Sequence, residues 1–166
     1  MPEPLEYRDR IFIKLGGGTY RWVDLKRFGL TSDVDDLTAL RLLTRHVRYR
    51  DHYTSEDSSE LDSGNLHGPY WVDHIDEASF EPTLAKSAVA RLREWANEWG
   101  SPDEKNLAEL DRTVYPIIET ATSVYLLPNL RERAQHEWGR VLGDFLEFVV
   151  IDRTDQTLVM VVASDD

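Results

Sequence analysis

Histidine and carboxylate side chains gather in one part of this 166-residue sequence, and these residue types can bind a metal ion. His67, His74 and Asp76 would be the ligands, because imidazole nitrogen and carboxylate oxygen suit zinc, manganese or iron. Their spacing matches no familiar metal-binding motif. In a strand, Asp73 and His74 would also point to opposite faces. We therefore expect no metal and no other cofactor, and keep a small metal-dependent hydrolase as an alternative function.

Nucleophilic catalysis has little support from the residue types. The sequence contains no Cys, and its serines lie in neither a GxSxG nor an SxxK motif. A pair of carboxylates working as in a glycosidase has no spacing signature, because the fold sets its geometry. Whether the protein is an enzyme stays open, and the sequence favours a protein that is not one.

Three arginines follow one another at helical spacing, and their guanidinium groups could bind anions. Arg41, Arg45 and Arg48 lie at positions i, i+4 and i+7, and no acid lies four residues before any of them. Arginine grips carboxylate or phosphate with two parallel hydrogen bonds. We expect internal ion pairs with Glu56, Asp57 and Glu60, with contact to an external anion as the alternative.

The segment from residue 51 to residue 81, called the acidic segment below, contains nine carboxylates and no Lys or Arg. Aromatic residues are interleaved with its acids, and such a combination can anchor and steer a basic partner. The alternative is an acidic loop in contact with solvent, with its aromatic side chains turned into the core. The residues predicted to bind a partner are Tyr53, Glu56, Asp57, Glu60, Asp62, Tyr70 and Trp71.

The net charge of −12 excludes some partners and favours others. An acidic surface repels nucleic acid phosphates and anionic membranes, and it attracts basic proteins. The N-terminus has no apolar run behind a basic head, so it does not resemble a signal peptide. Together with the missing Cys, this favours a soluble protein in the reducing cytoplasm.

Periodicity predicts one α+β domain over residues 1–166, an antiparallel sheet covered on one face by three to five helices. The sheet would combine an N-terminal hairpin, a middle strand and a C-terminal hairpin around a four-residue turn. Residues 117–127 suit either a helix or a strand. The expected strands are 10–15, 19–25, 70–75, 145–152 and 157–163. The expected helices are 34–49, 83–99, 102–115 with an interruption at Pro116, and 128–142.

Local signals also predict where helices begin and end. Thr31-Ser32-Asp33 would cap the first helix, and Pro82 would be the first residue of the second. Ser101 and Glu104 would form a capping box around Pro102 at the start of the third. Residues 54–69 are rich in Ser, Gly, Asp and Glu, which is typical of a long surface loop.

In its size, acidity, lack of Cys and Trp-rich α+β layout, the chain resembles bacterial immunity proteins as a broad class. This resemblance implies a cytosolic protein that binds and inhibits a basic protein partner. A third hypothesis is a small-molecule-binding domain whose pocket is lined by Trp22, Trp95 or Trp138.

Overall fold

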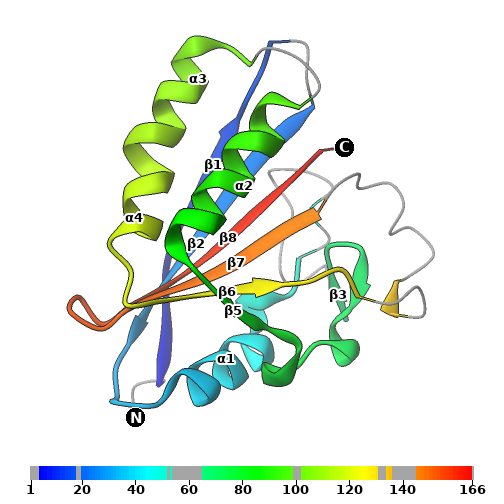
Figure 1. Ribbon diagram of the computed structural model, residues 1–166. Coiled ribbons are helices and arrows are strands. Elements are labelled where there is room, and N and C mark those ends of the chain that lie inside the picture. Colours follow the sequence, from blue (N-terminus) through cyan, green and yellow to red (C-terminus); the bar gives the residue numbers. More distant parts are fainter. Residues whose placement is uncertain are drawn as a thin grey trace.

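A six-stranded antiparallel sheet forms the centre of the protein (Figure 1). The computed structural model describes residues 4–17, 20–51, 53, 65–98, 102–130, 134–135 and 145–165. Within these residues the strand order is β1-β2-β8-β7-β6-β5, which confirms the predicted α+β class. The strands are β1 (Leu5–Lys14), β2 (Arg21–Leu30), β5 (Glu81–Thr83), β6 (Ser123–Leu127), β7 (Phe145–Asp152) and β8 (Thr157–Asp165).

Two hairpins supply the four neighbouring strands on one side of the sheet, as predicted. In the turn between β1 and β2, Gly16 and Gly17 have φ values of 66° and 64°, which favour glycine. Strands β7 and β8 pair from Phe145–Ser164 to Asp152–Thr157. Both are almost entirely buried, because the sheet is covered on both faces at its centre, and this explains their nearly continuous apolar sequence.

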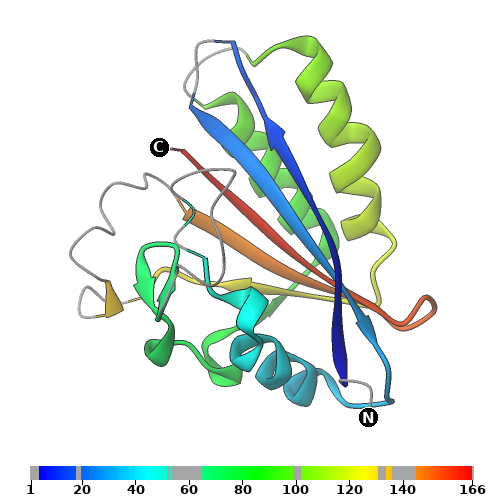
Figure 2. The same cartoon turned by 180° about the vertical axis from the view of Figure 1, so that it is seen from behind.

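Three helices pack on one face of the sheet, and a fourth packs on the other (Figures 1 and 2). The first group is α2 (Ala85–Asn97), α3 (Glu104–Glu109) and α4 (Tyr115–Glu119), and the helix on the second face is α1 (Asp36–Arg45). A separate two-stranded sheet is formed by β3 (Leu66–His67) and β4 (Tyr70–Trp71). It lies on the same side of the main sheet as α1. The sheet therefore separates two apolar clusters, one under each covering layer.

Several element boundaries differ from the sequence prediction because tertiary pairing overrides local signals. The expected strand 70–75 ends at Trp71, and a 3₁₀ turn follows at Val72–His74. Pro82 lies in β5 instead of opening α2, where edge pairing needs no backbone donor from it. The N-caps of α1 and α3 are Asp35 and Asp103, so the predicted capping residues Thr31 and Ser32 lie before the helix.

The ambiguous stretch 117–127 contains both a helix end and a strand. A π-helical turn, Leu110–Val114, precedes Pro116 and joins α3 to α4. This is the predicted interruption, since proline has no N–H to donate. The chain then reverses at Ala121–Thr122 and enters β6. Most of the predicted helix 128–142 lies outside the described residues, as do Ser101 and Gly100.

Candidate functional site

Backbone hydrogen bonds hold Asp51, the first residue of the acidic segment, beside residues 66–68. Asp51 forms a parallel β-bridge with His67, and its backbone N–H donates to Leu66 O at 3.0 Å. The Gly68 N–H in turn donates to Asp51 O at 2.7 Å. The two ends of the stretch that carries Glu56, Asp57, Glu60 and Asp62 are therefore held together. Those four carboxylates lie outside the described residues.

A buried ion pair holds the Asp51 side chain below this bridge. Lys26 Nζ donates to Asp51 Oδ2 at 3.0 Å and to the carbonyl oxygen of Arg48 at 3.0 Å, and both charged side chains are fully buried. Asp51 Oδ1 accepts from the Tyr53 N–H at 2.8 Å. Lys26 Nζ also lies 4.8 Å from the centre of the Tyr53 ring, a cation–π contact. The base of the acidic segment is thus anchored to strand β2.

A second cation and a second carboxylate complete the cluster. Arg10 Nε donates to Asp24 Oδ1 at 2.5 Å, and Arg10 Nη2 lies 3.7 Å from Asp51 Oδ2. Burial is the largest influence on Asp24 and raises the pKa of its carboxyl, against the lowering effect of Arg10 and Lys26. Two cations thus face two carboxylates. Asp24, Asp51 and Lys26 are fully buried and Arg10 is 15% exposed, so each buried charge depends on the others.

A second buried polar group adjoins the first. His67 Nδ1 lies 2.6 Å from the Tyr49 carbonyl oxygen, and because that oxygen can only accept, Nδ1 carries a hydrogen. His67 Nε2 contacts Glu147 Oε1, and the Tyr49 hydroxyl donates to Glu147 Oε2 at 2.7 Å. The Tyr49 and His67 rings stack with their centroids 3.7 Å apart. Burial, and then the nearby Glu147 carboxyl, raise the pKa of Tyr49 well above its ordinary value.

These His, Glu and Tyr side chains form a buried hydrogen-bonded group and not an accessible reaction centre. Tyr49, His67 and Glu147 each have 0% of their surface exposed, so no substrate reaches them in this conformation. The three residues come from the 3₁₀ turn at Val47–Tyr49, from β3 and from β7. Their hydrogen bonds join the acidic segment to the centre of the sheet.

Lys26, Asp24 and Glu147 were not among the site residues predicted from the sequence, although a signal for Asp24 and Lys26 was present. Every second residue of β2 points to the same face of the sheet, and from position 22 to position 28 these are Trp22, Asp24, Lys26 and Phe28. Two charged residues between two large aromatic residues on a buried face predict internal ion pairing. The partner of each charge could not be identified, because Asp51 and Arg10 reach the cluster through tertiary packing.

The described residues among the predicted partner-binding positions differ in exposure. Tyr53 and Tyr70 are 1% and 3% exposed and lie in the apolar cluster under α1, so their side chains are not available at the surface. Trp71 is 41% exposed. For Tyr53 and Tyr70 the structure agrees with the alternative, aromatic side chains turned into the core. Trp71 alone remains a surface aromatic residue among the three.

Other carboxylates of the acidic segment lie at the surface. Asp73, Asp76 and Glu81 are exposed, and the Asp76 side chain caps the 3₁₀ turn Glu77–Ser79. Glu77 accepts a hydrogen bond from Arg41 Nε at 2.8 Å, and this bond is the main cause of the lowered pKa of Glu77. Of these surface acids, Glu77 is the one joined to another element by an ion pair between described residues.

The three arginines at helical spacing do not act together. Arg41 forms an internal ion pair with the acidic segment, through Glu77 and not through the expected Glu56, Asp57 or Glu60, which lie outside the described residues. The Arg48 guanidinium lies 4.5 Å from the Tyr7 ring centre, and Arg45 is exposed in the last turn of α1. Among the described residues, the base of the segment is held by the buried Lys26–Asp51 pair.

The two alternative sites do not assemble among the described residues. His67 is buried against Glu147, whereas His74 and Asp76 are exposed, and no group of three possible metal ligands occurs in the part of the chain that is described. Trp22 and Trp95 lie in different apolar clusters on opposite faces of the sheet, so they line no common pocket. Trp138 lies outside the described residues.

Comparison with known proteins identifies no family. No protein-family model matches the sequence, and the search of curated proteins gave no match. The crystal structure of citrus MAF1 aligns with 91% of this chain and 92% of its own, at 11% sequence identity and a TM-score of 0.39. Similarity at that level carries no argument about function. Among the described residues, no helix has the length and apolar character needed to cross a membrane.

Proposed function

We propose that this protein binds a basic protein partner through its acidic segment and thereby inhibits it, in the manner of an immunity or inhibitor protein of the cytoplasm. The observation that carries the proposal is the contrast within the segment. Its first carboxylate, Asp51, is consumed in a buried ion pair, whereas Asp73, Asp76 and Glu81 face solvent. Uncompensated surface carboxylates raise the rate of encounter with a basic partner and favour it over acidic competitors.

The anchored base supports this function physically. An interface loses affinity when binding must also order its residues, because that order costs conformational entropy. Here both ends of the loop are fixed by backbone hydrogen bonds between Asp51 and Leu66–Gly68, and the Asp51 side chain is held by Lys26. The half-exposed Trp71 adjoins these acids in the chain and would supply an aromatic anchor.

The test compares two variants with the same change in net charge. The first replaces Glu56, Asp57 and Glu60 by Gln, Asn and Gln. The matched control replaces Glu94, Glu98 and Glu119 by Gln, three exposed carboxylates on or beside α2 and α4, on the other side of the sheet. Immobilised wild-type protein and both variants are exposed to lysate of the native host, and retained proteins are quantified by mass spectrometry.

A partner that fits the proposal is basic, is retained by the wild type and the control, and is lost at raised ionic strength. With the purified partner, the first variant should raise Kd at least about tenfold, a change of roughly 1.4 kcal/mol. Trp71→Ala should weaken the complex by about 2 kcal/mol if Trp71 is an anchor. Equal retention by both charge variants, or no protein retained above the background, would show that the acidic segment is not a recognition surface.

A further inference from the structure

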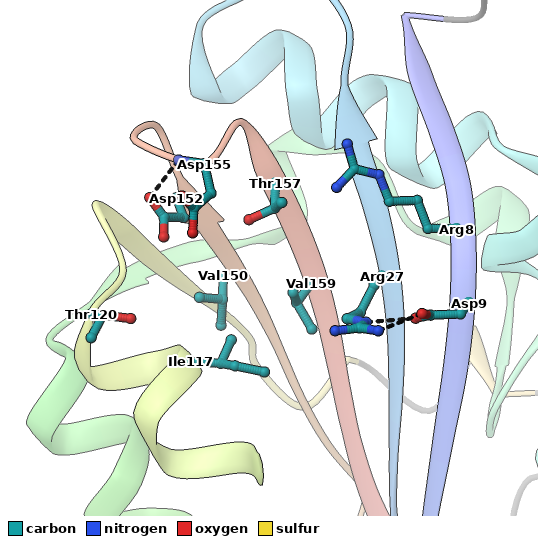
Figure 3. A pocket seen from close by; sticks show the side chains of 10 residues that line it. All are labelled: Arg8, Asp9, Arg27, Ile117, Thr120, Val150, Asp152, Asp155, Thr157 and Val159. Carbon is teal, nitrogen blue, oxygen red and sulfur yellow. Dashed lines mark hydrogen bonds and ion pairs between the residues drawn. The ribbon is translucent and has the colours of Figure 1, made fainter.

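A pocket lies on the face of the sheet that carries α2, α3 and α4, beyond the end of the helical layer (Figure 3). Its volume is about 310 Å³, and its floor is formed by Val150 and Val159, which pair across β7 and β8. Arg8 and the Arg27–Asp9 ion pair lie on one side, Asp152 and Asp155 lie on the other, and Thr157 lies between them. The described apolar residues of the acidic segment pack on the opposite face, so this pocket is independent of the proposed function.

A β-bulge explains how both Arg8 and Asp9 reach this face. Tyr7 packs edge-on to Phe28 and Arg10 binds Asp24, both on the α1 side of the sheet. Strict alternation would put residues 7 and 10 on opposite faces. The register shift between Tyr7 and Asp9 inserts one extra residue, so two successive side chains enter the pocket.

The two arginines of the pocket differ in their bonding. Arg27 pairs with Asp9 through two hydrogen bonds, and this bonding is the main cause of the lowered pKa of Asp9. Arg8 is exposed, and within the described part of the chain no hydrogen bond or ion pair engages its guanidinium. It lies instead across the backbone of Gly29. A Cβ at position 29 would be 2.5 Å from Arg8 Nη2, so only glycine leaves room for this arrangement.

The opposite wall is set by the turn between β7 and β8. Asp152 Oδ1 accepts hydrogen bonds from the N–H groups of Thr154 and Asp155, at 2.9 and 3.2 Å, which fixes the turn. The Asp155 carboxylate is exposed beside it and forms no hydrogen bond or ion pair with the described residues. One side of the pocket therefore offers the Arg8 cation, whose charge also acts on Asp9, and the other offers the Asp155 carboxylate. Neither group has a hydrogen bond or ion pair within the described residues.

From this charge arrangement we infer that the pocket binds a small zwitterion, a free amino acid or a dipeptide, with its carboxylate at Arg8 and its ammonium group at Asp152 and Asp155. Gly29, Thr157 and Asp152 are aligned across β2, β8 and β7. Two strand spacings separate the walls by about 10 Å. A hydrogen bond of about 3 Å at each end leaves about 4 Å between the ligand's charges, the scale of an amino acid or a bent dipeptide.

Each part of the pocket has a role in this recognition. The Arg8 guanidinium offers two parallel N–H groups to a carboxylate, while Arg27 and Asp9 hold and neutralise each other beside it. The hydroxyl of Thr157 lies between the two walls and can bond to either end of the ligand. The apolar floor of Val150 and Val159 contacts the carbon atoms. A ligand with a single charge would satisfy one wall and leave the other unpaired.

The experiment is an NMR titration of the full chain with glycine and diglycine, compared with N-acetylglycine and glycinamide, each of which keeps one charge. The zwitterions should shift the backbone amide signals of Thr157 and Asp155 saturably. The singly charged probes should bind at least tenfold more weakly. Arg8→Gln and Asp155→Asn should each weaken the zwitterions at least fivefold, and Gly29→Ala should do the same by displacing Arg8. Arg91→Gln, an exposed arginine on α2, is the matched control and should change nothing.

Three results would overturn the inference. Equal binding of N-acetylglycine and glycine would make the pocket a simple anion site, and equal binding of glycinamide would make it a simple cation site. If neither glycine nor diglycine saturates the signals at about 50 mM, well above the millimolar range expected for so small a ligand, the pocket binds no zwitterion. The backbone amide spectrum of each variant shows whether it is folded.

Discussion

Replacing Lys26 by Met tests whether the buried charge cluster holds the base of the acidic segment. Met has a similar length and no charge, so the change removes the cation and both hydrogen bonds of Lys26 Nζ, to Asp51 and to the Arg48 carbonyl. Asp51 would then be buried with one remaining cation, Arg10, at 3.7 Å. Breaking a buried ion pair by removing one partner costs about 3–5 kcal/mol, because the other charge stays desolvated.

The free energy of unfolding is measured by urea denaturation, followed by the fluorescence of the five tryptophans. For a chain of this size we expect the loss to lower Tm by roughly 10 °C. Lys86→Met is the matched control, because Lys86 is exposed on α2, and it should change the free energy of unfolding by less than about 0.5 kcal/mol.

A double-mutant cycle separates the ion pair from packing effects. Asp51→Asn keeps an oxygen that can accept the hydrogen bond from the Tyr53 N–H, so it removes mainly the charge. The double variant should be more stable than the sum of the two single losses predicts, by at least about 1 kcal/mol, because the second change removes the unpaired charge that the first one leaves. If Lys26→Met costs less than about 1 kcal/mol, or if the two losses add, the cluster does not hold the segment as argued.

Two further predictions concern single contacts. Gly68→Ala should lower the free energy of unfolding by about 3 kcal/mol. The φ angle at this position is +53°, and a Cβ would lie 2.4 Å from the Phe145 ring. A loss below about 1 kcal/mol in urea denaturation would contradict this close approach. Asp36 has a lowered pKa, because hydrogen bonds from Tyr125, Arg153 and Ser123 together outweigh burial, its largest single influence, which raises the pKa. Its stabilisation is therefore present above the unfolded pKa of about 3.9 and is lost as pH falls through the lower folded value, so the wild type should lose more stability than Asp36→Asn between roughly pH 5 and pH 2. Parallel unfolding curves of the two proteins over that range would rule this out.

Much of the fold follows from local sequence. The runs 145–152 and 157–163 are apolar and β-branched around a polar turn, and they become β7 and β8. The helical periodicity of Leu37, Leu40, Leu43 and Val47 predicted α1, and Leu40 and Leu43 are buried, whereas Leu37 and Val47 are exposed. These elements were predictable because their own side chains decide which face is buried. Positions such as Pro82 were not, because an edge strand is defined by its partner, here β6, which lies about forty residues further along the chain.

For the carboxylates too, some properties follow from the sequence and others from the tertiary structure. The sequence by itself determined that the acidic segment carries no compensating cation, since charge is a property of composition. It also determined the α+β class, through the two periods of its apolar residues. Which carboxylates remain at the surface was decided by tertiary structure, because Asp51 meets Lys26 and Glu77 meets Arg41 only after β2, α1 and the segment have packed.

The pocket beyond α4 was decided in the same way. Arg8 and Gly29 lie far in the sequence from Asp152 and Thr157. Strand register makes them neighbours, and a single bulged residue brings Arg8 to the same face. Strand pairing is a relation between distant segments, set by the burial of whole faces. For this reason the chain's own alternation predicts its strands, while only the assembled sheet places two charged walls on either side of one pocket.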